Sequence, residues 1–178
     1  MTGSSADINL ILVNLLKQAG VQAYPILFST RENGLANSFY PFLNQFNTVI
    51  AYAQVDYNFY ILDATDKVFS YKLTPEAIVN TKGFVVQGEK GKWIDVVDMT
   101  HKYKVMTAVH GVIDADGVMK GDCLVNCDGY AKKQRCRSWM KDKDKFREEY
   151  FTKPYTALKI EDFAMNNAEY DSLPLEQK

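Results

Sequence analysis

The chain has 178 residues and a formal net charge of −1, and 47% of its residues are hydrophobic and 13% aromatic. This composition excludes a disordered chain and supplies a sizeable core for one domain, or for one domain and part of a second. The balanced charge provides no attraction to nucleic acid or to an anionic membrane surface. No apolar run approaches the roughly 20 residues that a transmembrane helix needs, and no secretory leader pattern is visible.

The first predicted element is a helix over residues 4–19. Ser4 suits its N-cap, and Asp7 three residues later completes a capping box. Gly20 follows as a stop signal. Apolar residues recur at helical spacing along this segment, namely Ile8, Ile11, Leu12, Leu15 and Ala19. Because the helix begins almost directly after Met1, with no preceding element to pack it, we expect the chain to be part of a longer polypeptide.

Strands follow the helix in the first half of the chain. Residues 21–30, 46–55 and 58–62 are rich in β-branched and aromatic side chains, and Asp56-Tyr57-Asn58 predicts a hairpin between the last two strands. Thr74-Pro75-Glu76 predicts a short helix with proline in its first turn. Further strands are expected over 83–87 and 93–97.

The second half opens with a clear hairpin signal. Asp114-Ala115-Asp116-Gly117 separates predicted strands over 105–113 and 118–127. Residues 130–151 are charged and favour a helix, which Pro154 ends. One more strand is expected over 158–165, and the polar tail, 166–178, is expected to be cut in mid-element.

The three cysteines do not form a recognisable framework. An odd count at the spacing of Cys123, Cys127 and Cys136 is neither a disulfide pattern nor a zinc signature. Cys123 and Cys127 lie about 13 Å apart on one strand face, too far for a disulfide. We therefore expect buried or half-buried free thiols, and no metal or cofactor.

A basic stretch lies within the predicted helix of the second half. Residues 132–147 hold eight Lys and Arg residues against Asp142 and Asp144. Because no aromatic stacking platform accompanies them, we interpret them as a solvated helix face and expect no nucleic-acid binding. The opposite, apolar side is expected to comprise Tyr130, Cys136, Trp139, Met140, Phe146 and Tyr150.

Five segments in a fixed order resemble the transglutaminase-like superfamily, in its bacterial branch with flanking β-rich domains. They are Gly3–Leu10, Leu15–Gly20, Pro25–Arg31, Phe46–Ile50 and Leu62–Thr65. The resemblance implies an α+β fold with a papain-like core, a helix packed on an antiparallel sheet, over residues 1–90. It further implies a β-rich extension with one helix, itself incomplete, over residues 91–178.

The resemblance also places a catalytic triad. In active members a Cys at the helix start is deprotonated by a His on the next strand, and an Asp orients the His. Those positions fall on Ser5, Thr48 and Asp63, and the 15-residue step from 48 to 63 fits a hairpin that sets the two side by side. Only the Asp is retained. Thr48 cannot act as a base near neutral pH, and an aspartate with an ordinary pKa near 3.9 is a poor one.

These substitutions favour a non-catalytic domain. We expect a scaffold, or a module that binds an unidentified protein or peptide, in a larger protein that the resemblance places in the periplasm or cell envelope. The alternative is an acyl-transfer or amide-hydrolysing enzyme that uses Ser5 or a rearranged site, with His101 or His110 as a substitute base. A third reading makes the C-terminal region a protein-interaction surface. Ser4, Ser5 and Asp7 also suit a plain helix start, and Asp63 suits a plain strand end.

Overall fold

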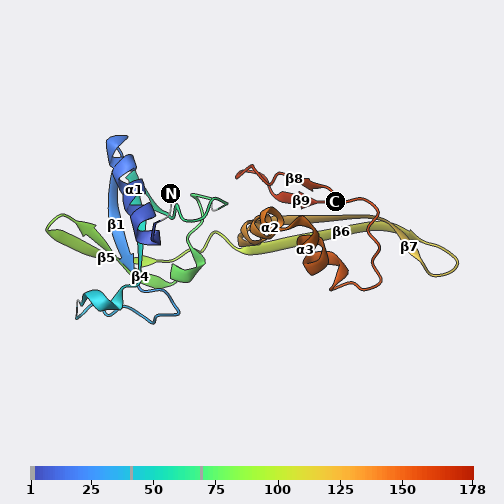
Figure 1. Cartoon of the computed structure of the whole chain (residues 1–178), viewed down its shortest axis with the longest axis horizontal. Helices are drawn as coiled ribbons and strands as arrows, with labels where there is room; N and C mark the ends of the chain where they lie inside the picture. The colour runs from blue at the N-terminus through green and yellow to red at the C-terminus, as the bar shows by residue number, and fades with distance from the viewer. Residues whose placement is uncertain (1–2, 41, 69) are drawn as a thin grey trace. The chain divides into compact units, whose positions relative to one another are not determined.

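The computed structural model describes residues 3–40, 42–68 and 70–178 (Figure 1). The chain divides into two compact units, residues 1–100 and residues 101–178. Both units combine helices with an antiparallel sheet, which confirms the predicted α+β class. Within the described ranges, no helix is both long and apolar enough to cross a membrane.

The first unit packs one helix on a five-stranded antiparallel sheet. The strand order is β3-β2-β1-β4-β5, so β1, the first strand after the helix, lies at the centre between β2 and β4. Short 3₁₀ turns cover Leu43–Gln45 and Glu76–Ile78. The elements are α1 (Ser5–Gln18), β1 (Gln22–Phe28), β2 (Thr48–Val55), β3 (Asn58–Leu62), β4 (Thr81–Gln87) and β5 (Lys90–Val96).

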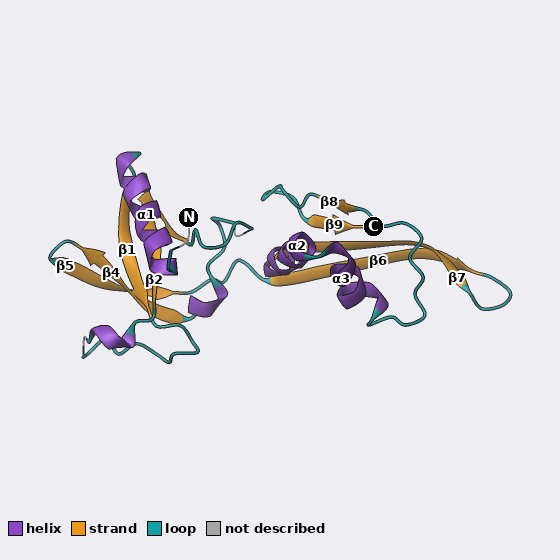
Figure 2. Cartoon of the chain, in the orientation of Figure 1, coloured by secondary structure: helices purple, strands orange, loops and turns teal. Residues whose placement is uncertain are grey.

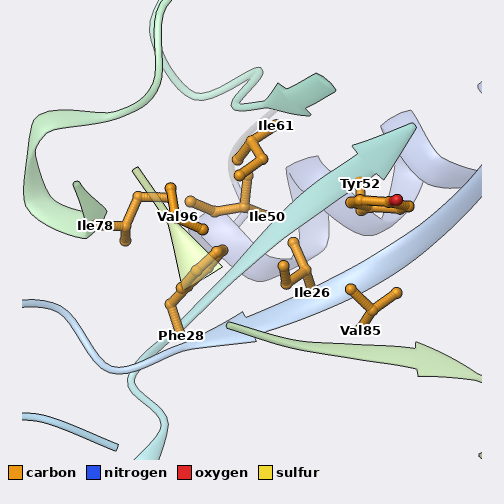
Figure 3. Close-up of a cluster of buried hydrophobic side chains, with 8 residues drawn as sticks. All are labelled: Ile26, Phe28, Ile50, Tyr52, Ile61, Ile78, Val85 and Val96. Carbon is orange, nitrogen blue, oxygen red and sulfur yellow. The ribbon is translucent and has the colours of Figure 1, made fainter. Parts of the chain in front are cut away.

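The two faces of this sheet differ because side chains alternate along each strand. On the α1 face, β1 and β2 present the small residues Ala23 and Ala51, which pack with Val13 and let the helix approach closely. The opposite face holds the larger core shown in Figure 3, with α1 on the far side of the strands. Its members are Ile26, Phe28, Ile50, Tyr52, Ile61, Ile78, Val85 and Val96.

One glycine makes this core possible. Gly83 of β4 lies opposite Phe28 of β1, and a Cβ placed on Gly83 would lie 2.4 Å from the Phe28 ring. The absent side chain therefore lets the ring lie across β4, where it is fully buried.

Most predicted elements of the first unit are confirmed, with three differences. Pro75 precedes the 3₁₀ turn as its N-cap residue and does not open an α-helix. The last strand begins at Lys90, and not at residue 93. Because that strand pairs with β4 along its whole length, the boundary expected at residue 90/91 cuts a hairpin, and the division lies after Thr100.

The second unit is built on a long two-stranded ribbon. β6 (Tyr103–Ile113) pairs with β7 (Met119–Gly129) over eleven residue pairs, and the full strand order is β6-β7-β9-β8. The remaining elements are α2 (Tyr130–Lys141), α3 (Lys143–Arg147), a π turn (Glu148–Thr152), β8 (Met165–Asn166) and β9 (Leu175–Gln177). Figure 2 shows the turn end of the ribbon projecting beyond α2 and α3.

Two predictions for this unit are wrong. The helix expected over 130–151 breaks at Asp142, whose carboxylate accepts hydrogen bonds from the Asp144 and Lys145 amides and starts α3. The strand expected over 158–165 is reduced to its last residue, because Phe163 packs against Trp139 and Phe151 in the core. The tail instead supplies β9, which pairs with β7.

The basic stretch is only partly a solvated face. Arg137, Lys141, Lys143 and Lys145 are exposed, as expected. Lys133 is buried, however, and the Arg135 guanidinium lies 4.4 Å from the centre of the Tyr150 ring and donates to Gln177 Oε1. Met140, expected on the apolar side as a core or docking residue, is 59% exposed and is not part of the core.

The cysteines are free, but only two are buried. Burial raises the pKa of the Cys127 and Cys136 thiols. Gln177 Nε2 lies 3.3 Å from Cys127 Sγ, and Cys136 Sγ lies 3.8 Å from the Ala168 carbonyl oxygen. Cys123 is exposed on β7, which corrects the expectation of burial for that residue.

This difference in exposure predicts the thiol chemistry. At mildly alkaline pH a chromogenic disulfide reagent should react rapidly with one thiol per native chain, because only Cys123 is accessible. The other two should react only on unfolding. The Cys123→Ser variant should lose the rapid phase, and three equally rapid thiols in the native chain would contradict the assignment.

Candidate functional site

Ser5, where the resemblance places the nucleophile, is the first residue of α1 and is exposed. The capping box uses its neighbour: Ser4 Oγ donates to Asp7 Oδ2 at 2.8 Å and accepts from the Asp7 amide. The Ser4 amide also donates to Asp7 Oδ2, and these hydrogen bonds lower the pKa of the Asp7 carboxyl. The helix is therefore capped without the Ser5 hydroxyl.

Thr48, where the resemblance places the base, opens β2 and is half-buried opposite Phe28 of β1. Strand alternation sets it on the face of Ile50, away from α1. The β2–β3 register pairs Ala51 with Leu62, so one further step would set Asp63 level with Ile50. The expectation that positions 48 and 63 lie side by side is therefore wrong by two residues, or about 7 Å along the strand.

Asp63, where the resemblance places the orienting aspartate, lies directly after β3 and is half-buried. Its Oδ1 accepts hydrogen bonds from the Thr65 amide at 3.0 Å, from Thr65 Oγ1 at 2.8 Å and from Asn9 Nδ2 at 3.0 Å. The carboxylate thus closes the turn after β3 and binds the helix.

Asn9 is the centre of this arrangement. It is 1% exposed, and its Nδ2 donates both to Asp63 Oδ1 and to the Val49 carbonyl at 3.0 Å. Its Oδ1 accepts from the Ala64 amide at 2.9 Å. We call these three hydrogen bonds the Asn9 bracket, since they fasten α1 to β2 and to the end of β3. Ser5 lies one helical turn before Asn9 on the same helix face.

The sequence interpretation missed Asn9 because it chose a different helix face. Ile11 and Leu15, two of the apolar residues that recur at helical spacing, are 42% and 57% exposed. The buried face runs through Asn9 and Val13, with Leu12 and Leu16 partly buried beside it. The spacing 9, 13, 16 is also helical, but an amide at its first position hid the pattern.

The first unit, residues 1–100, contains no histidine and no cysteine. Among the described residues, no group of His, Cys, Asp and Glu side chains is placed to hold a metal ion. Both histidines belong to the second unit, where His110 is exposed on β6. A small hollow of about 70 Å³ in the first unit is lined by residues such as Phe59, Tyr71 and Val96, and by none of the three triad positions.

A loop between β1 and β2 displays apolar side chains at the same end of β2 as Thr48. The sequence has no charged residue between Glu32 and Asp56, and the exposed apolar loop could have been predicted from this uncharged stretch. We call residues 33–46 the aromatic loop; residue 41 lies outside the described residues. Its large exposed side chains are Leu35 at 81%, Phe39 at 88%, Tyr40 at 72%, Phe42 at 54% and Leu43 at 80%.

Hydrogen bonds hold the base of the aromatic loop. Asn33 Nδ2 donates to Ser29 Oγ and to the Gln45 carbonyl, and Gln45 Oε1 accepts from the Asn37 amide at 2.7 Å. Asn47, next to Thr48, accepts from the Thr30 amide. Ser29 and Gln45 are buried. The loop is thus ordered by its base while its apolar side chains face solvent.

Comparisons of the chain with protein-family models, with curated proteins and with solved structures found no match.

The Asn9 bracket predicts a strong and pH-dependent effect of Asn9→Asp. The variant removes both donated hydrogen bonds and sets a second buried carboxylate beside Asp63, which should lower the free energy of unfolding at pH 7 by about 3 kcal/mol or more. Burial and Asp63 raise the folded-state pKa of the new carboxyl above its unfolded value near 3.9, so the loss should grow as pH rises above about 4.

Urea unfolding at pH 4 and pH 7 measures this effect. Asn14→Asp is the matched control, because Asn14 is exposed on the same helix. That control should change stability little at either pH. An Asn9→Asp variant as stable as its control, or a loss that does not grow with pH, would contradict the bracket.

Proposed function

We propose that the first unit is a catalytically inactive transglutaminase-like domain with a papain-like core. It serves as a scaffold or a protein- or peptide-binding module in a larger protein of the periplasm or cell envelope. The order of elements supports this: Ser5 opens a helix that packs on an antiparallel sheet, Thr48 opens β2, and Asp63 follows its hairpin partner β3.

One observation supports the proposed loss of activity. Asp63, the residue that would orient an imidazole in an active relative, accepts hydrogen bonds at Oδ1 from Asn9 Nδ2, the Thr65 amide and Thr65 Oγ1. A serine at a helix start gains only about 0.3–1 kcal/mol of charge stabilisation from the helix dipole, far too little to ionise a hydroxyl without a base in contact. Ser5 retains the position of a nucleophile without the groups that activate one.

Restoring the two missing residue types tests the alignment. In a Cys123→Ser background, which removes the exposed native thiol, the alignment predicts that Ser5→Cys with Thr48→His gives a thiol whose pKa the imidazole lowers. At pH 6 its alkylation by iodoacetamide should be about tenfold faster than that of a control pair, because the thiolate fraction rises more than its nucleophilicity falls.

The control pair combines Ser5→Cys with Gln54→His. Gln54 is exposed on the same strand, six residues and about 20 Å from Thr48. Equal alkylation rates in two folded proteins would contradict the alignment. The unmodified chain should show no amide hydrolysis or amine transfer, and activity that Ser5→Ala abolishes would establish the alternative, an enzyme that uses Ser5.

The binding role is proposed for the aromatic loop. Exposed Phe, Tyr and Leu side chains on a preorganised base supply apolar contact at little entropic cost, and Asn and Ser residues among them supply adaptable hydrogen bonds. The absence of charge from the loop favours an uncharged, apolar peptide segment as its ligand.

Selection from a random peptide library on the immobilised chain tests this role. The recovered peptides should be rich in apolar and aromatic residues. Phe39→Ser with Leu43→Ser should abolish their enrichment, whereas Tyr57→Ser, at a fully exposed aromatic on the β2–β3 turn, should not. Enrichment that survives the loop variant would contradict the proposal, as would binding to lipid vesicles alone.

A further inference from the structure

The outer strand of the second sheet is unusually open. β6 lies at the edge of the order β6-β7-β9-β8 and is exposed along all eleven residues. It carries little of the usual protection of an edge strand: it has no proline, and Lys104 is its only residue with a permanent charge. Its apolar side chains include Val109 at 56%, Val112 at 73% and Ile113 at 66% exposure.

The hydrogen-bond phase of the ribbon shows which backbone groups are free to pair outward. The Asp114 amide donates to the Val118 carbonyl, and the Tyr130 amide donates to the Lys102 carbonyl. Because hydrogen-bonded and non-hydrogen-bonded pairs alternate along an antiparallel ladder, the even-numbered residues of β6 direct their N–H and C=O groups toward β7. The odd-numbered residues therefore direct their N–H and C=O groups away from the sheet; these are Tyr103, Val105, Thr107, Val109, Gly111 and Ile113.

We propose that β6 is a homodimer interface, in which two copies of the chain pair antiparallel through this edge about a two-fold axis at Ala108. This register sets Thr107 opposite Val109 of the second copy, Val105 opposite Gly111 and Tyr103 opposite Ile113. Every such pair joins two outward-facing odd residues, so the backbone hydrogen bonds of both edges are satisfied together. The two four-stranded sheets become one continuous sheet.

The side chains fit the same register. Lys104 lies opposite Val112 of the second copy and His110 opposite Met106, so no like charges face each other across the axis. A peptide strand of another protein would satisfy the same backbone groups. When β6 pairs with β6 of a second copy in this register, all eleven residues overlap and no like charges lie opposite each other. This favours a second copy as the occupant.

α2 covers one end of the ribbon and leaves the turn end bare, and these two ends complement each other in the dimer. Val125 and Cys127, which lie opposite Thr107 and Val105, are buried against α2. Toward the turn, Val109 and Ile113 are exposed, and Figure 2 shows this end of the ribbon beyond the helices. In the two-fold arrangement the bare half of each β6 lies beside the half of the second β6 that is nearest its own α2.

Sedimentation equilibrium of the full chain over a wide concentration range tests the dimer. The mass should rise from the monomer value of 20.3 kDa toward twice that value. Val109→Pro removes an outward N–H that β7 does not use, and proline is tolerated on an edge strand. This variant should keep its circular dichroism spectrum and remain monomeric.

A charge pair tests the register itself. Thr107→Lys with Val109→Lys sets lysine opposite lysine at two places across the axis and should give a monomer. Thr107→Lys with Val109→Glu sets lysine opposite glutamate at the same places and should still dimerise. A native chain that stays monomeric at every concentration overturns the proposal, as does dimerisation that survives Val109→Pro. Equal association of the two charge variants also overturns it.

Discussion

The first unit depends on one buried amide. Asn9 donates to the Asp63 carboxylate and the Val49 carbonyl and accepts from the Ala64 amide, so a single side chain joins the helix to two neighbouring strands. An unsatisfied buried polar group costs about 1–3 kcal/mol, and the three partners of Asn9 therefore make its position strongly specified. Around this contact the alanines of β1 and β2 let α1 approach the sheet closely.

The same contact gives Asp63 a structural role that does not depend on catalysis. In the proposed ancestry Asp63 would orient a histidine, but here its carboxylate has a structural partner in Asn9 and closes its own turn through Thr65. On that proposal the carboxylate keeps a structural role although the positions of the thiol and the imidazole hold Ser5 and Thr48. The neighbouring aromatic loop, to which we assign the proposed binding role, has a buried polar base separate from its exposed apolar side chains.

Local signals predicted the local structure well. The Ser4–Asp7 capping box and the Asp114–Gly117 turn are confirmed because both depend on nearest neighbours in sequence. Features set by tertiary contacts were missed. Asn9 was hidden because its partners lie 40 and 54 residues away, β9 because its pairing with β7 is long-range, and the break at Asp142 because helix propensity outweighed a capping side chain. Of the candidate site, the sequence placed Ser5 correctly at a helix start, but it misjudged the register between Thr48 and Asp63.

A double-mutant cycle between Asn9 and Asp63 tests the central claim most directly. The free energy of unfolding would be measured at pH 7 for the native chain, for Asn9→Ala, for Asp63→Ala and for the double variant. The hydrogen bond from Asn9 Nδ2 to the Asp63 carboxylate predicts a coupling energy of about 1–3 kcal/mol. Additive effects, with a coupling energy near zero, would contradict the role of Asn9 as the partner that holds Asp63.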